Sequence, residues 1–534
     1  MIGRKKVEEW IELIQKRDTN LISHLESIYG QNDTLIDERL DTLSQIAMKF
    51  RRIYGSEREI SFVRAPGRLN TLGMHVDHRG GFVNPIAINR EILLCYSARN
   101  DTFVQVHNMD ASYGKRRFNI TEELPFEEVT TVKDWLTWTQ QQTNKRRELG
   151  VDQDWVNKLK STPVYLQVKY PQRNLLGLDS ILNSNIPAGM GLSSSSAIVV
   201  GMMEALTDIN HISLTDDEFV NYCGISEWFV GTRGGSGDHA AIKFGRLGMI
   251  THMKTLPELT IKSYLPFPEG YQMIVFNSGI TADKSGSARQ KFNEKTATYE
   301  IGEIYIREYL QRHYGGIFRK IVREYSKEGK KRFHLADVIE QLSQSQIYEL
   351  IQSLPERMSR EKLLAQLPEY QDFLREQFAT HLEPEEGYEI RSVLTYGIAE
   401  CERSRMLEEV TREGNIKLFG ELMNVSHDGD RVSFKSPEQR KRKSVINTNQ
   451  PLYLQPGGYN CSIPEIDDMV DLALEAGAEG AQISGAGLGG SMMVLVKADK
   501  FNHVREVLRS KYYLPRKIKE DFIVVSPMQG AGQL

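Results

Sequence analysis

Three separate stretches of the sequence concentrate residue types that handle anionic or hydroxyl-bearing ligands. The first, IPAGMGLSSSSA at 186–197, places glycines and four consecutive serines just before an apolar run that predicts a helix. Glycines let a backbone approach a ligand closely, and free amide groups at a helix N-terminus attract phosphate. The lysine of a Walker-type loop is absent, so a serine-capped helix without a ligand is an equally good interpretation of this segment alone.

The second stretch, SGAGLGGS at 484–491, lies between the apolar runs AQI and MMVLV and predicts a turn between two strands. A dinucleotide-binding loop would lead into a helix instead, which excludes that interpretation. The third, RAPGRLNTLGMHVDHRGG at 64–81, crowds arginines, an asparagine, an aspartate and histidines into one segment. A structural turn explains its final glycines but not these polar side chains, and a metal site would need at least three converging ligands.

The elements that must position these stretches change character along the chain. Residues 1–52 carry apolar side chains at helical spacing, which predicts a helical arm. From Ile60, short β-rich runs separated by Gly, Asn and Asp predict a mostly antiparallel or mixed sheet. Residues from about 291 to 417 are charged and helical in pattern, and a second mixed half follows from about Phe419 to the strand-like FIVVSP.

Composition limits the classes of function. The chain has 534 residues, 40% of them hydrophobic, which is enough for two or three domains with real cores. A net charge of −4 provides no overall field for nucleic acid, and the basic run KSPEQRKRKS at 435–444 has no interleaved aromatics, so we expect a solvated loop there. Without a signal peptide or membrane span, we expect a cytoplasmic protein that binds neither membrane nor nucleic acid. Four widely spaced cysteines fit reduced, buried thiols.

In order and spacing, the three stretches resemble the signature motifs of the GHMP kinases, and 64–81 is similar to the galactokinase signature. The likeness continues in EWFVGTRGGSGDHAAIKFG at 227–245, FGELMNVSH at 419–427 and YNCSIPEIDDMV at 459–470. The resemblance implies a two-lobed α+β GHMP kinase fold, with a ribosomal protein S5 domain 2-like N-terminal lobe, a ferredoxin-like C-terminal lobe and helical extensions. The expected parts are a helical extension at 1–52, the N-terminal lobe at 53–265, and the C-terminal lobe at 266–534 with a helical insertion around 300–390.

The resemblance also assigns roles. Asp238 would face the anomeric hydroxyl of a sugar, and Arg68 would keep that carboxylate ionised while offsetting charge on the transferring phosphoryl group. Gly485 and Gly489 would support the phosphate site from the second half. The ATP-binding residues implied are Gly189, Gly191, Leu192, Ser193, Ser194, Ser195, Ser196, Gly487 and, near the adenine, Trp135, with a core role as the alternative for the tryptophan. The Mg²⁺ ligands implied are Ser194, Ser195 and Glu227.

Alignment from Gly231 and Asp238 puts Ser226 where galactokinases often have the magnesium glutamate. Glu227 is one step further along, and one step turns a side chain by about 100° around a helix. We therefore expect Glu227 to act through water, or the metal to be held by serine and phosphate oxygens alone.

His75, Asp77, His78, Gly235 and Arg289 are the sugar-binding residues that the resemblance implies. Three positions depart from galactokinases: Met74 replaces a glutamate, His78 a tyrosine, and Arg289 a second tyrosine. Losing an anion and gaining an arginine would suit a sugar with a carboxylate at C6, and the plant galacturonate kinases of this family share the missing glutamate and the HxDH pattern.

The expected reaction is therefore ATP-dependent phosphorylation of the anomeric hydroxyl of a galactose-like hexose or hexuronic acid, giving a sugar 1-phosphate. The alternatives are a specific uronic-acid kinase, a catalytically silent sugar sensor, and a kinase for a non-sugar alcohol, which the HVDH stretch disfavours. The expected partners are the sugar, ATP and Mg²⁺, in a monomer or homodimer.

Overall fold

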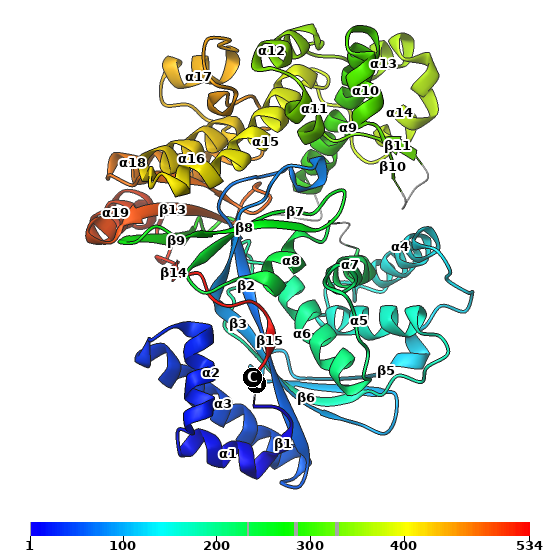
Figure 1. Ribbon diagram of the computed structural model, residues 1–534, viewed down its shortest axis with the longest axis vertical. Helices are drawn as coiled ribbons and strands as arrows, with labels where there is room; N and C mark the ends of the chain where they lie inside the picture. The colour runs from blue at the N-terminus through cyan, green and yellow to red at the C-terminus, as the bar shows by residue number, and fades with distance from the viewer. Residues whose placement is uncertain (1, 232–233, 282–286, 326–329) are drawn as a thin grey trace.

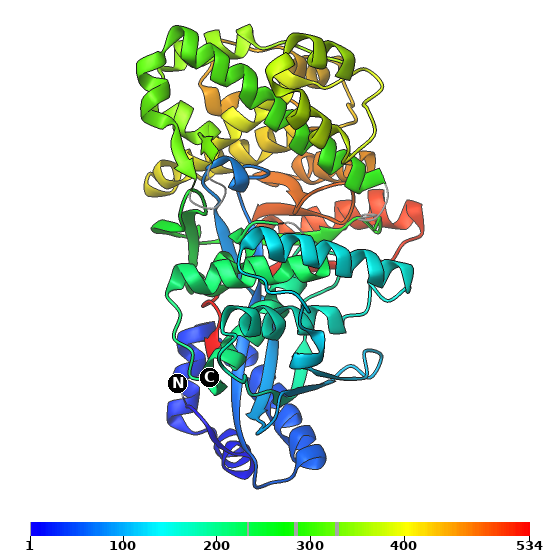
Figure 2. The ribbon, with the colours of Figure 1, turned by 90° about the vertical axis from the view of Figure 1, so that its right-hand side faces the viewer.

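Two sheets lie between a small group of helices at one end of the protein and a larger group at the other (Figure 1). The computed structural model describes residues 2–231, 234–281, 287–325 and 330–534. Both ends of the described chain meet beside the N-terminal helices (Figure 2), where the Gly3 amide donates to the Leu534 carbonyl. Within the described ranges, no helix combines the length and apolar character that crossing a membrane requires.

The N-terminal arm is helical, as its apolar spacing predicts: α1 (Val7–Gln15), α2 (Thr19–Tyr29) and α3 (Asp33–Tyr54). Asp18 and Asn32 cap the N-termini of α2 and α3 with their side chains. The apolar faces of these helices pack on the central sheet. Between them, buried Glu91 pairs with Arg39 and Arg64, and these two cations outweigh burial and lower the pKa of Glu91.

The central sheet is mixed, with strand order β1-β2-β3-β6-β4-β5, β15 pairing with β2, and β4 parallel to β6. The helix α6 packs on β2 and β3, and thus fixes the serine-rich segment against the strand that carries Arg68. The strands of the central sheet are β1 (Lys5–Lys6), β2 (Glu59–Asn70), β3 (Pro85–Ala98), β4 (Phe103–Asn108), β5 (Lys115–Asn119), β6 (Leu178–Ser184) and β15 (Gly532–Gln533). The helices in the same part of the chain are α4 (Val132–Glu148), α5 (Val156–Lys169), α6 (Ser194–Ile209), α7 (Asp216–Ser226) and α8 (Gly237–Phe244). The hairpin of β7 (Met249–Lys254) and β8 (Thr260–Pro266) follows them.

The second sheet is antiparallel, in the order β12-β13-β9-β14. The middle residues of its central strands β13 and β9 are buried, and alternate side chains of these strands form one apolar core with α18 and α19. Its elements are β9 (Tyr271–Asn277), α16 (Ile416–Asp430), α18 (Pro464–Glu475), β12 (Gly480–Ser484), β13 (Ser491–Lys497), α19 (Phe501–Leu508), α20 (Leu514–Arg516) and β14 (Phe522–Val525).

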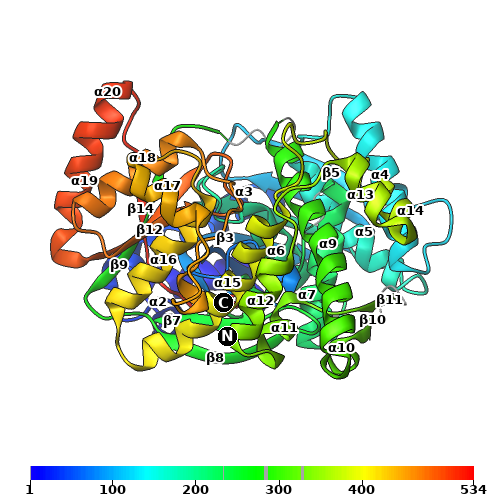
Figure 3. The same ribbon diagram turned by 90° about the horizontal axis from the view of Figure 1, so that it is seen from above.

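The charged middle of the chain folds into a helical layer with its own apolar core. Seen from above, α9, α11, α12 and α15 lie over the lobes (Figure 3). The layer comprises α9 (Ser287–His313), α10 (Gly315–Ile321), α11 (Leu335–Gln341), α12 (Gln344–Ser353), α13 (Arg360–Gln366), α14 (Gln371–Phe378), α15 (Ile390–Arg412) and the ribbon β10 (Arg323–Tyr325) with β11 (Lys330–Arg332).

Two minor sequence predictions have different outcomes. All four cysteines are buried free thiols, as predicted. The prediction of a loop at 435–444 is wrong, because Pro437–Ser444 forms the short helix α17. Ser436 caps it with its side chain and Pro437 occupies the first turn, where its fixed φ suits a helix.

Candidate active site

The core of the site is a paired contact between Arg68 and Asp238. Arg68 lies near the end of β2, and Asp238 lies in the first turn of α8. The Nε and Nη2 atoms of Arg68 donate to the two Asp238 oxygens, each at 2.7 Å. The Ser193 hydroxyl donates to the same carboxylate at 2.5 Å. The Asp238 side chain is nevertheless 39% exposed, so the carboxylate is oriented by the protein yet accessible to a ligand.

The serine-rich segment forms a tight loop before α6. Gly189, Gly191 and Ser193 all have positive φ, and α6 begins at Ser194. This turn directs the Gly191 carbonyl to Arg68 Nη1, 2.7 Å away. The first amide groups of α6 have no acceptor within the helix, and the predicted phosphate site depends on these groups.

The glycine-rich turn between β12 and β13 packs against this loop from the second sheet. A Cβ on Gly191 would lie 3.0 Å from the Ser484 carbonyl oxygen, and one on Gly490 would lie 3.2 Å from the Gly189 carbonyl oxygen. Gly487 has φ of 75°, and a Cβ there would lie only 2.1 Å from the Cys461 carbonyl oxygen. The two loops therefore meet backbone to backbone, and glycine is required where they do.

Glu227 approaches the serine loop more closely than the sequence analysis expected. The α-helix α7 ends at Ser226 and a 3₁₀ turn, Glu227–Val230, follows, which changes the rotation per residue at this point. The Glu227 carboxylate accepts a hydrogen bond from the Ser196 hydroxyl at 3.1 Å and lies 3.0 Å from His239 Nε2. Burial alone would raise the pKa of Glu227, but His239 and the serine hydroxyls outweigh burial and lower this pKa to about 2.

The oxygen atoms of Glu227 and the neighbouring serines match the ligands that Mg²⁺ prefers. One ionised carboxylate beside serine hydroxyls offers the hard oxygen ligands that Mg²⁺ takes, with phosphate oxygens and water completing the shell. In the part of the chain that the structure describes, no group of three or more His, Cys, Asp or Glu side chains could hold a metal by itself. The residues present therefore fit a metal that is bound together with a nucleotide.

Asp77 and His78 lie in a segment that we call the sugar loop (Gly73–Gly81). The His78 Nδ1 atom lies 3.0 Å from Asp77 Oδ1. Burial would raise the pKa of Asp77, but the hydrogen bond and charge of His78 outweigh it and lower this pKa to about 2. A Cβ on Gly235 would lie 3.7 Å from Asp77 Oδ2, so Asp77 adjoins the segment that leads into Asp238.

Two predicted site residues, His75 and Trp135, are not brought into this arrangement. The His75 side chain is 4% exposed, stacks on Tyr459 at 4.2 Å between ring centres, and lies 3.5 Å from Asp430. Trp135 is 1% exposed in an aromatic cluster, and its indole N–H donates to the Ile225 carbonyl. The burial of Trp135 therefore agrees with the core role that the sequence left as the alternative, and His75 faces the protein rather than the open site. The Arg289 side chain lies outside the described residues.

Sequence reasoning missed a buried carboxylate under the sugar loop. Glu400, on α15, accepts hydrogen bonds from the Gly73 and Met74 amides, both at 2.9 Å, and pairs with buried Arg403. The Met74 side chain is buried in the core of the second sheet. The contact joins residues more than 300 positions apart, so no local pattern could have revealed it.

Comparison with known proteins identifies the family. The chain matches the galactokinase galactose-binding signature over residues 48–98, the GHMP kinases N terminal domain over 157–246 and the GHMP kinases C terminal domain over 406–514. The chain is a galactokinase-like GHMP kinase. A galactokinase of Chloroflexus aggregans is 26% identical over 86% of this chain and 89% of its own length. A galactokinase of Dictyostelium discoideum is 23% identical over 94% of this chain and 93% of its own length.

The solved structure of Lactococcus lactis galactokinase complexed with galactose has the same fold as this GHMP kinase. The two align with a TM-score of 0.63 and 20% identity, over 93% of this chain and 100% of that one. The predicted two-lobed α+β GHMP kinase fold is thus confirmed, and the enzyme is a phosphotransferase.

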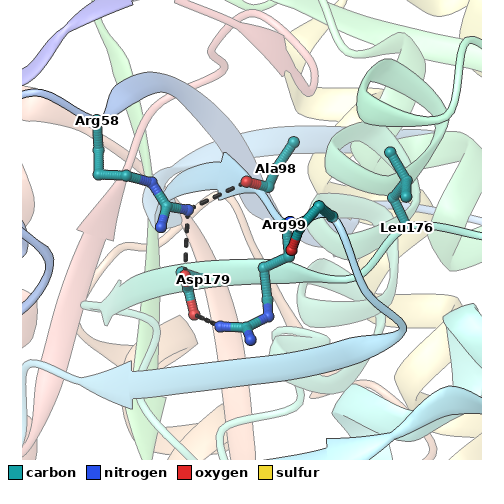
Figure 4. A pocket seen from close by; sticks show the side chains of 6 residues that line it. Arg58, Ala98, Arg99, Leu176 and Asp179 are labelled. Atoms are coloured by element: carbon teal, nitrogen blue, oxygen red, sulfur yellow. Dashed lines mark hydrogen bonds and ion pairs between the residues drawn. The ribbon is translucent and has the colours of Figure 1, made fainter.

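A cavity of about 540 Å³ lies elsewhere in this GHMP kinase, where the end of β3 meets the start of β6 beside Arg58 (Figure 4). Arg58 and Arg99 line it; Arg99 donates to Asp179 Oδ1 at 2.7 Å, and Arg58 forms an ion pair with Asp179 Oδ2 at 3.1 Å. Arg99 also forms a paired contact with Asp101. The cations of this cavity are thus balanced by the protein's own carboxylates, and neither Arg68 nor Asp238 lines it.

Proposed function

We propose that this kinase transfers the γ-phosphoryl group of ATP to the anomeric hydroxyl of a galactose-type hexose, giving ADP and a sugar 1-phosphate. The observation that carries the proposal is the accessible Asp238 carboxylate, held by Arg68 and Ser193 between the serine loop and the sugar loop. The galactokinases among its relatives support the choice of a hexose.

The proposed chemistry follows from the Arg68 and Asp238 pair. The anomeric O–H of the sugar donates to Asp238, and the anomeric oxygen attacks the γ-phosphorus. The bond from that phosphorus to the bridging oxygen of ADP breaks. The proton goes to the Asp238 carboxylate, and ADP leaves with the bond electrons. Phosphoryl transfer depends chiefly on positioning and charge stabilisation, which one fixed carboxylate and one fixed guanidinium provide.

The phosphates of ATP would lie on the amides of the serine loop, supported by the glycine-rich turn. Ser194, Ser195 and Glu227 would hold Mg²⁺, which when bound neutralises phosphate charge. Glu227 is ionised at neutral pH because its pKa lies at about 2. His239 and Ser196 orient its carboxylate.

A hexuronic acid is the second candidate substrate, and the environment of Met74 favours it. Galactose recognition through its C6 hydroxyl would use an acidic acceptor near this loop. The nearby Glu400 carboxylate is fully buried and already accepts from two amides and Arg403. The His78 side chain, in contrast, is 31% exposed, and as an imidazolium it would place a positive charge near a ligand carboxylate.

The decisive experiment combines a substitution with a sugar screen. Asp238→Asn keeps the size of the side chain but removes the proton acceptor, so transfer should fall to background while ATP binding, measured by calorimetry, stays close to that of the wild type. Galactose, galacturonate, glucuronate, arabinose and N-acetylgalactosamine are then compared with ADP release as the readout. Wild-type turnover by Asp238→Asn would refute the mechanism. Strong activity on galactose with none on uronates would exclude the second candidate, and no activity on any sugar would favour a sugar sensor.

A further inference from the structure

The helical layer packs directly on the sugar loop. Val76 of that loop belongs to the apolar core of the layer, beside Tyr299. A Cβ on Gly80 would lie 2.7 Å from the His334 Cβ, and one on Gly81 would lie 2.9 Å from the Cys401 sulfur. The loop and the helices are therefore fitted to each other without space for a further atom, and neither can shift alone.

Arg79 is the polar centre of this contact. Its side chain is 4% exposed, and its Nη1 atom donates to Glu300 at 2.8 Å and to Glu303 at 2.7 Å. The guanidinium carbon also lies 4.7 Å from the centre of the Tyr299 ring. The two glutamates are three positions apart on α9 and thus share one helix face.

The same short turn carries both Arg79 and the residues that face the substrate. Asp77, His78 and Arg79 form one 3₁₀ turn. His78 contacts the edge of the same Tyr299 ring, with 5.9 Å between ring centres. Because the three residues are consecutive in one short turn, a displacement of the backbone at Arg79 also changes the positions of Asp77 and His78.

We propose that Arg79, held by Glu300 and Glu303 of α9, is a positioning residue that fixes the direction of Asp77 and His78. The helical layer thereby sets the affinity for the sugar. This inference rests on the proposed function. A buried ion pair adds little net stability relative to apolar packing, but it fixes one arrangement of the parts that it joins, and this is the use inferred here.

Protonation of Glu303 should tune this contact near neutral pH. Burial raises the pKa of Glu303 to about 7; Arg79 opposes this shift and Glu300 reinforces it. As the pH rises through that value, Glu303 becomes ionised. Arg79 attracts the new charge, but burial and the neighbouring Glu300 oppose it, so the folded arrangement of these side chains loses stability. The titratable and charged groups that face Glu303 and its partners from neighbouring elements are Arg79, Glu300, Arg332, His78 and Tyr299.

The test uses Arg79→Met, Arg79→Lys and Glu303→Gln in the full-length enzyme, with Glu308→Gln on the same helix as the matched control. We expect Arg79→Met to raise the KM for the sugar about tenfold with the KM for ATP nearly unchanged, because only the sugar side of the site loses its support. Arg79→Lys should restore part of the affinity, since it keeps the charge without the planar fork. Wild-type sugar KM should rise between pH 6 and 8, and Glu303→Gln should abolish that rise.

Melting curves show which variants are folded. If Arg79→Met does not fold, Arg79→Lys and Glu303→Gln answer the same question, because each keeps a polar partner in place. An unchanged sugar KM in folded Arg79 variants would overturn the inference, as would equal changes in both KM values. A wild-type enzyme inactive on every sugar would instead overturn the proposed function, and this inference with it.

Discussion

Arg68→Lys tests how much of the rate depends on the paired geometry at Asp238. Arg68 makes three hydrogen bonds of 2.7 Å, two to the Asp238 oxygens and one to the Gly191 carbonyl. A lysine keeps the positive charge but places it at a single point, so it can retain only one of the two bonds to Asp238 and loses the bond to Gly191.

The magnitude follows from these two losses. A hydrogen bond to a charged group contributes about 1.5–3 kcal/mol, and the lower end applies because the Asp238 side chain is 39% exposed. The neutral Gly191 contact adds about 1 kcal/mol. The total of about 2.5 kcal/mol corresponds to a fall of roughly 70-fold in kcat/KM, if both contacts persist in the transition state.

The assay is steady-state ADP release, with ATP affinity measured separately by calorimetry. Arg68→Met, which removes the charge as well, should be less active than Arg68→Lys, because Asp238 then loses its only cationic contact among the described residues. An Arg68→Lys enzyme within threefold of the wild type would show that the paired geometry does not act in the transition state. A fall caused by weaker ATP binding would refute the assigned role of Arg68.

Two further predictions concern residues outside the reacting groups. Trp135→Phe should leave the KM for ATP unchanged but lower the melting temperature, because the indole lies in the core and its hydrogen bond to the Ile225 carbonyl is lost. A large rise in the KM for ATP would instead support an adenine contact of Trp135. Asp467 lies 3.2 Å from His427, and its pKa falls to about 2 because this contact and backbone hydrogen bonds outweigh burial. Since the carboxylate is ionised more readily in the folded state, it contributes about 2 kcal/mol to the free energy of unfolding above about pH 4. This contribution is lost as the pH falls toward about 2. Unfolding experiments on Asp467→Asn should find a smaller loss of stability between about pH 4 and pH 2 than in the wild type. An identical pH dependence in both proteins would contradict this role of Asp467.

Local sequence determined those parts of the site that depend on backbone conformation. Gly189 and Gly191 occupy positive φ, and the serines begin a helix, as their pattern predicts. The resemblance to galactokinases also implied that Arg68 lies beside Asp238, although 170 positions separate them. The α17 helix could have been predicted too, because the signals for its start, Ser436 and Pro437, are present in the sequence.

Only the tertiary structure decided where the longer side chains point and what they contact. His75 stacks on Tyr459, and Glu227 contacts Ser196 because a 3₁₀ turn replaces the expected helical step. The contact of Arg79 with Glu300 joins residues 221 positions apart. A residue's own neighbours in the sequence restrict its backbone torsions, whereas burial and ion pairing depend on which distant elements pack against it. The sequence alone therefore predicted the family, the phosphate loop and the Arg68 and Asp238 pair, whereas only the tertiary structure showed that the helical layer packs on the sugar loop.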